Sequence, residues 1–260
     1  MLREAHEASI FGTVMHMSEP ATINAWLRVA DVVRGESASG FVAHNGMDIW
    51  DYYEKHSESC GYMIGAMRGL SMVWNPRAAR VVANRSQLGG KIVLDVGGSG
   101  GHFLRDLVRE ASPPPARAIN FDKPEVVASL TDGDGVEHVG GDFFDASTIP
   151  PFDVATLKWI LHDWDDERAT AIMRSVVSRM NEGGVVHIIE AVLPARGEVD
   201  ARDAQALSMD IHMLALTGGR ERSMAQWARI GDAVGLKITS ESISSPAGKL
   251  FVLSLANAWV

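Results

Sequence analysis

The chain has 260 residues (28.1 kDa), of which 46% are hydrophobic and 22% charged, a globular composition without the ~20-residue apolar stretch of a membrane span. Its formal net charge of −9 argues against nucleic acid as a partner, because a phosphate backbone is bound by a basic face. Its single cysteine, Cys60, excludes an internal disulfide framework and a cysteine-rich zinc site, and we expect no secretion signal in MLREAHEASIFG. The composition therefore predicts a cytoplasmic protein that handles small molecules or acts as an interaction module.

Residues 1–75 predict helices and loops without a strand. Apolar residues recur at helical spacing over 23–33, and Gly35 follows as a stop signal. Residues 36–45 are small and polar, which predicts a loop. A second helical run over 62–70 carries methionines and a tyrosine on one face. Such a stripe either packs in a core or forms an adaptable apolar wall over a ligand.

From residue 90 onward, short apolar runs alternate with helical stretches. We expect helices over 102–110, over 169–180 with Gly183-Gly184 at its end, and over 223–235 with Ser223 as its cap. The alternation predicts a mostly parallel, doubly wound α/β sheet covered on both faces, with a terminal β-hairpin at its edge. The predicted strands are 91–96, 118–122, 136–140, 154–157 and 185–189, and those of the hairpin are 237–242 and 250–255.

A glycine-rich loop, residues 97–101, separates the first predicted strand from the next helix. Glycines at this place let the backbone approach a nucleotide-like ligand, although they also form ordinary turns. The G-x-G-x-x-G fingerprint of NAD-binding proteins is not met, because Phe103 stands at its last position. Asp122 ends the next strand, where a carboxylate can accept both ribose hydroxyls. Asp142 and Phe143 follow the third strand and suit an adenine, so the pattern predicts an adenosine ligand without a pyrophosphate.

The loop after the fourth predicted strand carries His162, and Glu190 ends the strand that follows. Ligands of doubly wound sheets bind beyond the carboxyl ends of the strands, so His162 and Glu190 lie side by side if these two strands are neighbours. Asp163 or Glu221 can add negative charge. A carboxylate raises the basicity of a neighbouring imidazole, which is the arrangement of a general base. A purely structural contact between the two side chains is the other interpretation.

Six segments of the chain, taken in order, carry a family resemblance. They are LDVGGSGG (94–101), INFDKPEVV (119–127), HVGGDFF (138–144), LKWILHDWDDE (157–167), IIEAVLP (188–194) and SMDIHMLALTGGRERS (208–223). They resemble the S-adenosylmethionine-dependent O-methyltransferases of the plant and bacterial small-molecule type, which include caffeate, isoflavone and hydroxyindole methyltransferases. The resemblance covers roughly residues 26–260. It implies a Rossmann-like fold and methyl transfer from S-adenosylmethionine to a hydroxyl of an aromatic or polyketide-type small molecule.

The resemblance also implies roles for single residues. His162 is the expected general base, and Glu190 and Glu221 are expected to orient it. The expected cofactor contacts are Gly97, Asp122, Asp142, Phe143 and Lys158. The expected acceptor contacts are Met67, Trp159, Asp210 and Met213. No metal is implied, because the imidazole replaces the carboxylate cluster of the magnesium-dependent type.

Two features depart from the family pattern. Ser99 replaces the glycine that is usual at the third loop position, and serine there costs about 1 kcal/mol if the backbone is left-handed, which weakens cofactor binding. Family members also carry an N-terminal winged-helix-like dimerisation domain. We expect residues 1–75 to be a helical remnant of the dimerisation and lid region, and residues 76–260 to be the S-adenosylmethionine-binding catalytic domain. Relatives form homodimers, and that state is left open here.

Three other functions remain as alternatives. An N-methyltransferase needs a base less, so the pair His162 and Glu190 favours oxygen as the methyl acceptor. A cofactor-binding relative that no longer transfers methyl groups is disfavoured by the presence of His162, Glu190 and Glu221 together. An NAD-dependent oxidoreductase is disfavoured by Phe103.

Overall fold

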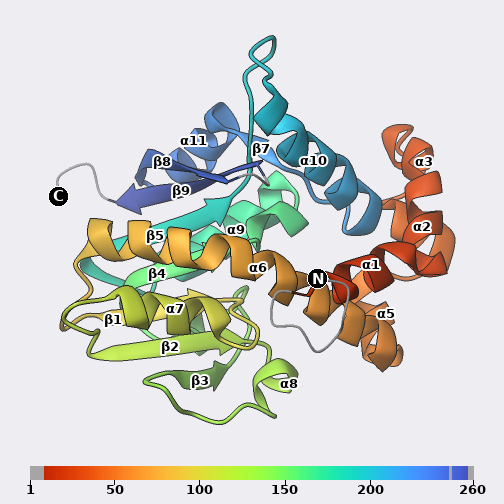
Figure 1. The fold of residues 1–260 in the computed structure, drawn as a ribbon. Helices are drawn as coiled ribbons and strands as arrows, with labels where there is room; N and C mark the ends of the chain where they lie inside the picture. The colour runs from red at the N-terminus through yellow and green to blue at the C-terminus, as the bar shows by residue number, and fades with distance from the viewer. Residues whose placement is uncertain (1–8, 246–247, 257–260) are drawn as a thin grey trace.

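The computed structural model describes residues 9–245 and 248–256, and a seven-stranded sheet lies at its centre (Figure 1). The strands of this sheet are β1 Ile92–Val96, β2 Arg117–Asp122, β3 Glu137–Gly140, β4 Phe152–Lys158, β5 Met180–Glu190, β8 Lys237–Ser245 and β9 Gly248–Ala256. Their order is β3-β2-β1-β4-β5-β9-β8. The strands β1 to β5 are parallel, whereas the hairpin β8–β9 is antiparallel and joins the sheet at β5. The mostly parallel sheet with a terminal hairpin is therefore confirmed.

Helices cover both faces of this sheet. The helices of the described residues are α1 Phe11–Ser18, α2 Pro20–Leu27, α3 Val29–Val33, α4 Gly40–Asn45, α5 Ile49–Lys55, α6 Ser57–Ser86, α7 His102–Glu110, α8 Pro124–Val127, α9 Asp166–Val177, α10 Ala204–Leu216 and α11 Met224–Ala233, and those after α5 include the ones that cover the sheet. Successive side chains of a strand point to opposite faces. Val93 accordingly packs in a core with α6 and α7, and Leu94 in a core with α9 and α11. Burial on both faces explains why the central strands β1 and β4 are largely apolar.

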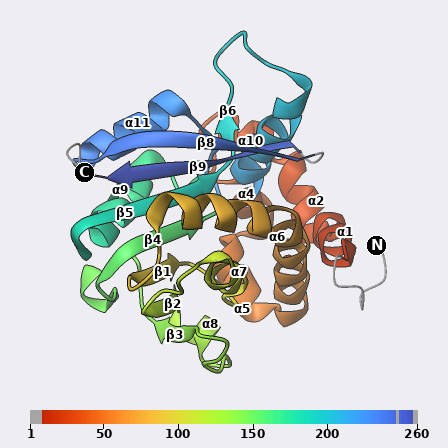
Figure 2. The ribbon, with the colours of Figure 1, turned by 60° about the vertical axis from the view of Figure 1, so that its left-hand side comes forward.

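The helices before β1 gather at one end of the molecule. α1 packs along α6, and α2 and α4 pack on each other and on α10 (Figures 1 and 2). The described residues up to 75 contain no strand, as predicted. The domain boundary predicted at residue 75 lies inside α6, so the division into two parts stays a prediction. None of the helices within the described ranges is long and apolar enough to cross a membrane.

The prediction of a loop over residues 36–45 is wrong in its second half, because α4 begins at Gly40. The hydroxyl of Ser39 accepts a hydrogen bond from the Val42 N–H at 3.0 Å and caps the helix. The small, polar composition that favours a loop also supplies this cap. The helical run over 23–33 is confirmed as α2 and α3, which are separated at Arg28.

The sequence pattern predicted that Gly183-Gly184 ends a helix, and this prediction is wrong. α9 ends at Val177, and β5 begins at Met180. The two glycines lie inside β5, where the pairing with β4 shifts register. An irregularity of this kind needs residues that adopt unusual backbone angles, and Gly183 has a φ of +73°. The helix capped by Ser223 is confirmed as α11, with a reciprocal capping box to Gln226.

Candidate active site

The carboxyl ends of β4 and β5 lie next to each other, because the two strands pair in parallel up to Lys158 opposite Ile189. The chain leaves β4 into a 3₁₀ turn, Leu161–Asp163, that carries His162. Glu190 ends β5, and its Oε1 accepts the backbone N–H groups of Ile160 and Leu161, each at 3.1 Å. The adjacency on which the sequence argument depended is therefore present.

A second, short sheet brings Glu221 to the same place. β6 (Val192–Leu193) continues from β5 and pairs in parallel with β7 (Arg222–Ser223). The residue before β7 is Glu221, so it lies close to the residue that ends β5. The backbone N–H of Glu221 donates to Oδ1 of Asp210 on α10 at 2.9 Å, which fixes the strand against this helix.

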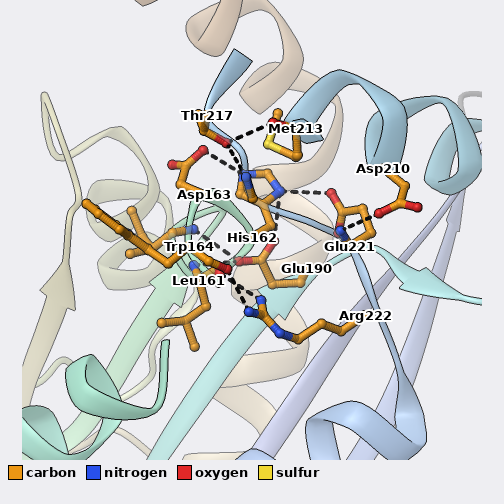
Figure 3. A network of polar contacts seen from close by, with 12 residues as sticks. Leu161, His162, Asp163, Trp164, Glu190, Asp210, Met213, Thr217, Glu221 and Arg222 are labelled. Atoms are coloured by element: carbon orange, nitrogen blue, oxygen red, sulfur yellow. Dashed lines mark hydrogen bonds and ion pairs between the residues drawn. The ribbon is translucent and has the colours of Figure 1, made fainter. Parts of the chain in front are cut away.

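The imidazole of His162 lies between carboxylates on both of its sides (Figure 3). Its Nδ1 is 2.8 Å from Oε1 of Glu221 and 3.4 Å from Oε2 of Glu190. Its Nε2 is 4.0 Å from Oδ1 of Asp163. The side chain of His162 is 8% exposed, and those of Glu190 and Glu221 are 0% and 1% exposed. Because a carboxylate only accepts hydrogen bonds, Nδ1 carries a proton that it donates to Glu221.

The carboxylates determine the charge of this imidazole. Burial alone would lower the pKa of His162, but Glu190 and then Glu221 outweigh it and raise that pKa to about 10. Burial also raises the pKa of Glu190, and His162 opposes this by attracting the carboxylate. Burial raises the pKa of Asp163 to about 6. The site thus stabilises a proton on His162 strongly, which is the property of a base that must accept one.

Arg222 clamps the loop that carries His162, and its guanidinium is fully buried. Its Nη1 and Nη2 donate to the carbonyl oxygens of Leu161 and Trp164, both at 2.7 Å, and its Nε donates to Asp166 at 2.9 Å (Figure 3). Two of the acceptors belong to the His162 loop, and Asp166 is the first residue of α9, which follows it. Since Arg222 follows Glu221 directly, one segment both holds the loop and supplies its closest carboxylate.

The glycine loop lies at the carboxyl end of β1, as the sequence predicted. Gly97 has a φ of +71°, which strains a residue with a side chain, and a Cβ at this position would lie 2.4 Å from Cδ1 of Ile160 and displace it. Ser99 has a φ of +49°, in the left-handed region where L residues are strained. Its N–H donates to Oδ2 of Asp122 at 2.8 Å. The left-handed backbone on which the cost of Ser99 depends is therefore present, and Asp122 closes against the loop.

Two buried polar groups stand close to this loop. Oδ2 of Asp95, the last polar residue of β1, is buried without a hydrogen-bond partner among the described residues, while Oδ1 accepts from Thr156 at 2.6 Å. Nζ of Lys158 donates to Ser71 at 3.1 Å and lies 3.8 Å above the ring of Trp159. Burial lowers the pKa of Lys158 to about 8, against the pull of Asp95 and Glu190. A carboxylate oxygen and an ammonium group are thus available to a ligand that carries both charges.

The other expected contact residues differ in their exposure and in their surroundings. Asp142 is exposed, and its Oδ1 accepts from the N–H of Phe144 at 2.9 Å in the turn after β3. The ring of Phe143 lies 6.1 Å from that of Trp164, beside the His162 loop. Met213 is buried near His162 (Figure 3), whereas Met67 on α6 is 38% exposed.

Residues 26–237 match the family model described as the O-methyltransferase domain. The chain belongs to the O-methyltransferase family. It is 33% identical over 234 residues to (S)-scoulerine 9-O-methyltransferase of Coptis japonica (90% of this chain, 60% of the relative). It is 34% identical over 218 residues to (R,S)-reticuline 7-O-methyltransferase of Papaver somniferum (82% and 59%). It is also 33% identical over 224 residues to nicotinate N-methyltransferase 1 of Glycine max (85% and 62%). The chain spans about three fifths of the length of these relatives.

Solved structures share the fold of this O-methyltransferase domain. The mitomycin 7-O-methyltransferase MmcR is 25% identical, with a TM-score of 0.81 over 97% of this chain and 73% of that chain. CalO1, a methyltransferase in calicheamicin biosynthesis in its SAH-bound form, is 26% identical, with a TM-score of 0.78 over 98% and 74%. The Rossmann-like methyltransferase fold expected from the sequence is therefore confirmed.

Sequence reasoning missed several polar residues near this site, one of which, His16, lies before the matched residues 26–237. Arg222, which clamps the His162 loop, is one of them, although it follows Glu221 in the segment 208–223 that carries the family resemblance. His212 is another, one position before Met213 on α10. His16 and Tyr53 come from α1 and α5, where the sequence offered a helical pattern but no motif. Only the packing of those helices on α6 and α10 identifies them.

Proposed function

We propose that this chain transfers the methyl group of S-adenosylmethionine to a hydroxyl of an aromatic or polyketide-type small molecule, with His162 as the general base. The observation that carries the proposal is the 2.8 Å contact between Nδ1 of His162 and Glu221, with Glu190 at 3.4 Å. Membership of the O-methyltransferase family supports it. The relatives named for O-methylation of scoulerine, reticuline and bergaptol support the class of acceptor.

S-adenosylmethionine, when bound, supplies a methyl group that its sulfonium has already activated. The chain must then remove the acceptor's proton and align the oxygen with the methyl carbon. A phenol titrates near 10 and a free imidazole near 6.5, so the proton transfer would be uphill by about 5 kcal/mol in water. The carboxylates that raise the pKa of His162 to about 10 remove most of this difference. Alignment of the two reactants contributes a further ~7–11 kcal/mol in favourable cases.

The tautomer of His162 suits this role. Glu221 accepts the Nδ1 proton, so the lone pair of the neutral ring lies on Nε2, on the opposite side. When Nε2 takes the proton of the acceptor, the charge that forms on the ring is stabilised by Glu221 and Glu190. Glu221 in turn is held by Asp210, and the loop of His162 is held by Arg222. We therefore assign positioning roles to Glu190 and Glu221, with Asp210 supporting the latter.

The described residues fit S-adenosylmethionine. The tight glycine loop at Gly97 admits a close backbone approach, and Asp122 beside it can accept ribose hydroxyls. The unpaired Oδ2 of Asp95 suits an ammonium group, and Lys158 suits a carboxylate. Asp142 and Phe143 are proposed for the adenine. We propose Met67, Trp159 and Met213 as acceptor contacts, together with the carboxylate of Asp210.

A hydroxyl is favoured over nitrogen as the acceptor, because an amine or ring nitrogen can be methylated without a base of the kind built at His162. The cytoplasm stays the predicted location, and a small-molecule acceptor without nucleic acid or membrane stays the predicted set of partners. Homodimerisation and the division of the chain into residues 1–75 and 76–260 also remain proposals.

Calorimetric titration with S-adenosylmethionine and with NAD tests the cofactor. We expect binding of the former only. Methyl transfer to a panel of phenols, followed as S-adenosylhomocysteine formed, tests the reaction, with His162→Ala beside the unmodified chain. Loss of transfer with retained S-adenosylmethionine binding is the expected result. Equal turnover by the two proteins would overturn the role of His162, and binding of NAD alone would overturn the proposed function.

A further inference from the structure

Polar side chains from α1, α5 and α10 gather near enough to the His162 site for Asp163 to act on Tyr53 and His162 on His212. We call His16, Tyr53 and His212 the polar cluster. The ring centroid of His16 is 6.4 Å from that of Tyr53 and 6.3 Å from that of His212. His16 and Tyr53 are buried, with 4% and 8% of their surface exposed. Three helices that are distant in the sequence therefore bring polar rings together in the interior.

Two atoms of the polar cluster are buried and unpaired. Nδ1 of His16 and Oη of Tyr53 have no hydrogen-bond partner within residues 9–245 and 248–256, nor has Oγ1 of Thr13, one helical turn before His16. An unpaired buried polar group costs about 1–3 kcal/mol, so folded proteins pair nearly all of them. Three such atoms in neighbouring residues indicate a place where a ligand supplies the partner.

The polar cluster is uncharged. The indole N–H of Trp26 donates to Nδ1 of His212 at 3.2 Å, so the neutral His212 ring carries its proton on Nε2. Burial, helped by His16 and His162, lowers the pKa of His212 to about 4. Burial also lowers the pKa of His16, although Glu19 opposes it, and raises that of Tyr53. The polar cluster therefore offers neutral O–H and N–H groups rather than a cation.

The charges that act on the polar cluster are mainly acidic. Glu19 acts on His16 and Tyr53, and Asp163 acts on Tyr53. The groups of opposite sign are the histidines His16 and His162, which both act on His212. No lysine or arginine within the described ranges is among the groups that shift these three pKa values. The carboxylates of Asp163, Glu190 and Glu221 also lie within 4.0 Å of the His162 ring, so a carboxylated ligand would meet repulsion, whereas a neutral one would not.

We propose, on the basis of the proposed function, that the acceptor is an uncharged aromatic compound with a second hydroxyl or carbonyl group, which Tyr53 and His16 bind. These two residues then determine specificity, and acceptors that carry a carboxylate are excluded. The aromatic character follows from the rings present, because Trp26 lies 5.6 Å from His212 and the polar cluster itself consists of rings. The second polar group provides the partner that the unpaired atoms lack.

Three naphthalenes with different groups at one position test the proposal: 2-naphthol, 2,7-dihydroxynaphthalene and 7-hydroxy-2-naphthoate. Their binding to the full chain loaded with S-adenosylhomocysteine is measured by calorimetry, and their kcat and KM by S-adenosylhomocysteine release. The same three substituents on benzene cover smaller acceptors. We expect the diol to bind at least about tenfold tighter than the mono-ol, and the carboxylate to bind weakest.

The matched variants are Tyr53→Phe and Tyr52→Phe. Tyr53→Phe should raise KM for the diol toward that for the mono-ol and abolish the preference. The ring of Tyr52 stacks on that of His56, with 3.8 Å between centroids, and lies 6.4 Å from that of Tyr53. Its hydroxyl is not among the buried atoms that lack a partner, so Tyr52→Phe should keep the preference. Unchanged S-adenosylhomocysteine affinity in both variants shows that they are folded.

Equal binding of all three compounds, tightest binding of the carboxylate, or a diol preference that survives Tyr53→Phe would overturn this inference. So would a panel of which no member binds. Methylation of the mono-ol in any of these cases leaves the proposed function standing. Failure to bind S-adenosylmethionine would instead overturn the proposed function.

Discussion

Two buried histidines, His162 and His187, show how the partners of an imidazole determine its chemistry. His187 lies in the middle of β5, where Nε2 is 2.6 Å from the hydroxyl of Ser86 and Nδ1 is 2.9 Å from that of Ser254. His162 lies beyond the end of β4 and contacts the carboxylates of Glu190 and Glu221. As whole residues, His187 and His162 are 1% and 7% exposed, so their burial is similar.

Their pKa values are shifted in opposite directions. Burial lowers the pKa of His187 to about 3, with help from Arg85 and Lys91, because hydroxyls offer no charge that compensates for lost water. The same burial acts on His162, but two carboxylates raise its pKa to about 10. Burial therefore makes a histidine neutral and structural, and carboxylates on Nδ1 turn it into a base. The predictions below test this contrast from the largest expected effect to the smallest.

Replacing each histidine should separate catalysis from structure. His162→Ala removes the base, and we expect kcat for a phenolic acceptor to fall by about 10²–10⁴-fold with cofactor affinity retained. His187→Gln changes a residue outside the His162 loop and outside the residues proposed to bind ligands. Its kcat should stay within about twofold of that of the unmodified chain. Steady-state kinetics with calorimetric cofactor titration measures both. Similar losses of kcat in the two variants would contradict the contrast.

His187 should make the fold sensitive to acid. Its pKa of about 3 in the folded chain lies below the value near 6.5 of the unfolded chain. As pH falls below about 6.5, the unfolded chain takes up a proton that the folded chain refuses, so stability falls. At about pH 4.5 the loss from this group is about 3 kcal/mol. Urea unfolding at several pH values measures it, and His187→Gln should flatten the slope. If the free energy of unfolding depended on pH equally in the variant, His187 would not be the cause of the acid sensitivity.

Removing one carboxylate should shift the pH at which His162 becomes active. Its pKa is raised in the folded chain, so the base-competent neutral form is gained as pH rises through that pKa. Glu221→Gln lowers this pKa, which should move the rising limb of kcat to lower pH by about one unit and reduce the plateau about tenfold. The kcat–pH profile of the variant is the measurement, with Asp232→Asn, an exposed change on α11, as control. A limb that stays in place would mean that Glu221 does not tune His162.

The smallest effect is expected for a hydroxyl of the His187 network. Ser254→Ala removes the hydrogen bond to Nδ1 and should lower the free energy of unfolding by about 1 kcal/mol. Because this change lies outside the His162 loop, kcat should stay the same. Denaturant unfolding and steady-state kinetics on the same preparation measure the two quantities. A fall in kcat would show that the hydrogen bonds of His187 affect catalysis, which would contradict the separation of the two histidines.

Much of the site could be predicted from the sequence because it lies at strand ends. Apolar runs that stop at Asp122 and Glu190 mark one edge of a parallel sheet, and a histidine loop between two such runs must reach the same edge. This reasoning predicted that His162 and Glu190 are neighbours. It gave Glu221 only as added charge, whereas Glu221 makes the shorter contact. The pairing of β6 with β7 that places it involves two residues a strand, too short to be seen as a pattern.

Other features depend on packing between distant helices. The polar cluster requires α1, α5 and α10 to meet, and helical periodicity does not specify which helices are neighbours. The two helix errors have local causes. Glycines in a strand irregularity resemble a helix stop at Gly183-Gly184, and the cap at Ser39 resembles loop composition.

Histidine nitrogen chemical shifts, followed by NMR across pH on ¹⁵N-labelled protein, test the central claim most directly. At about pH 8 the account predicts that both nitrogens of His162 are still protonated, and that Nε2 loses its proton as the pH rises through about 10 while Nδ1 keeps the proton that it donates to Glu221. His187 should stay neutral down to about pH 5. Loss of the His162 proton near pH 6.5, together with a similar titration of His187, would contradict it.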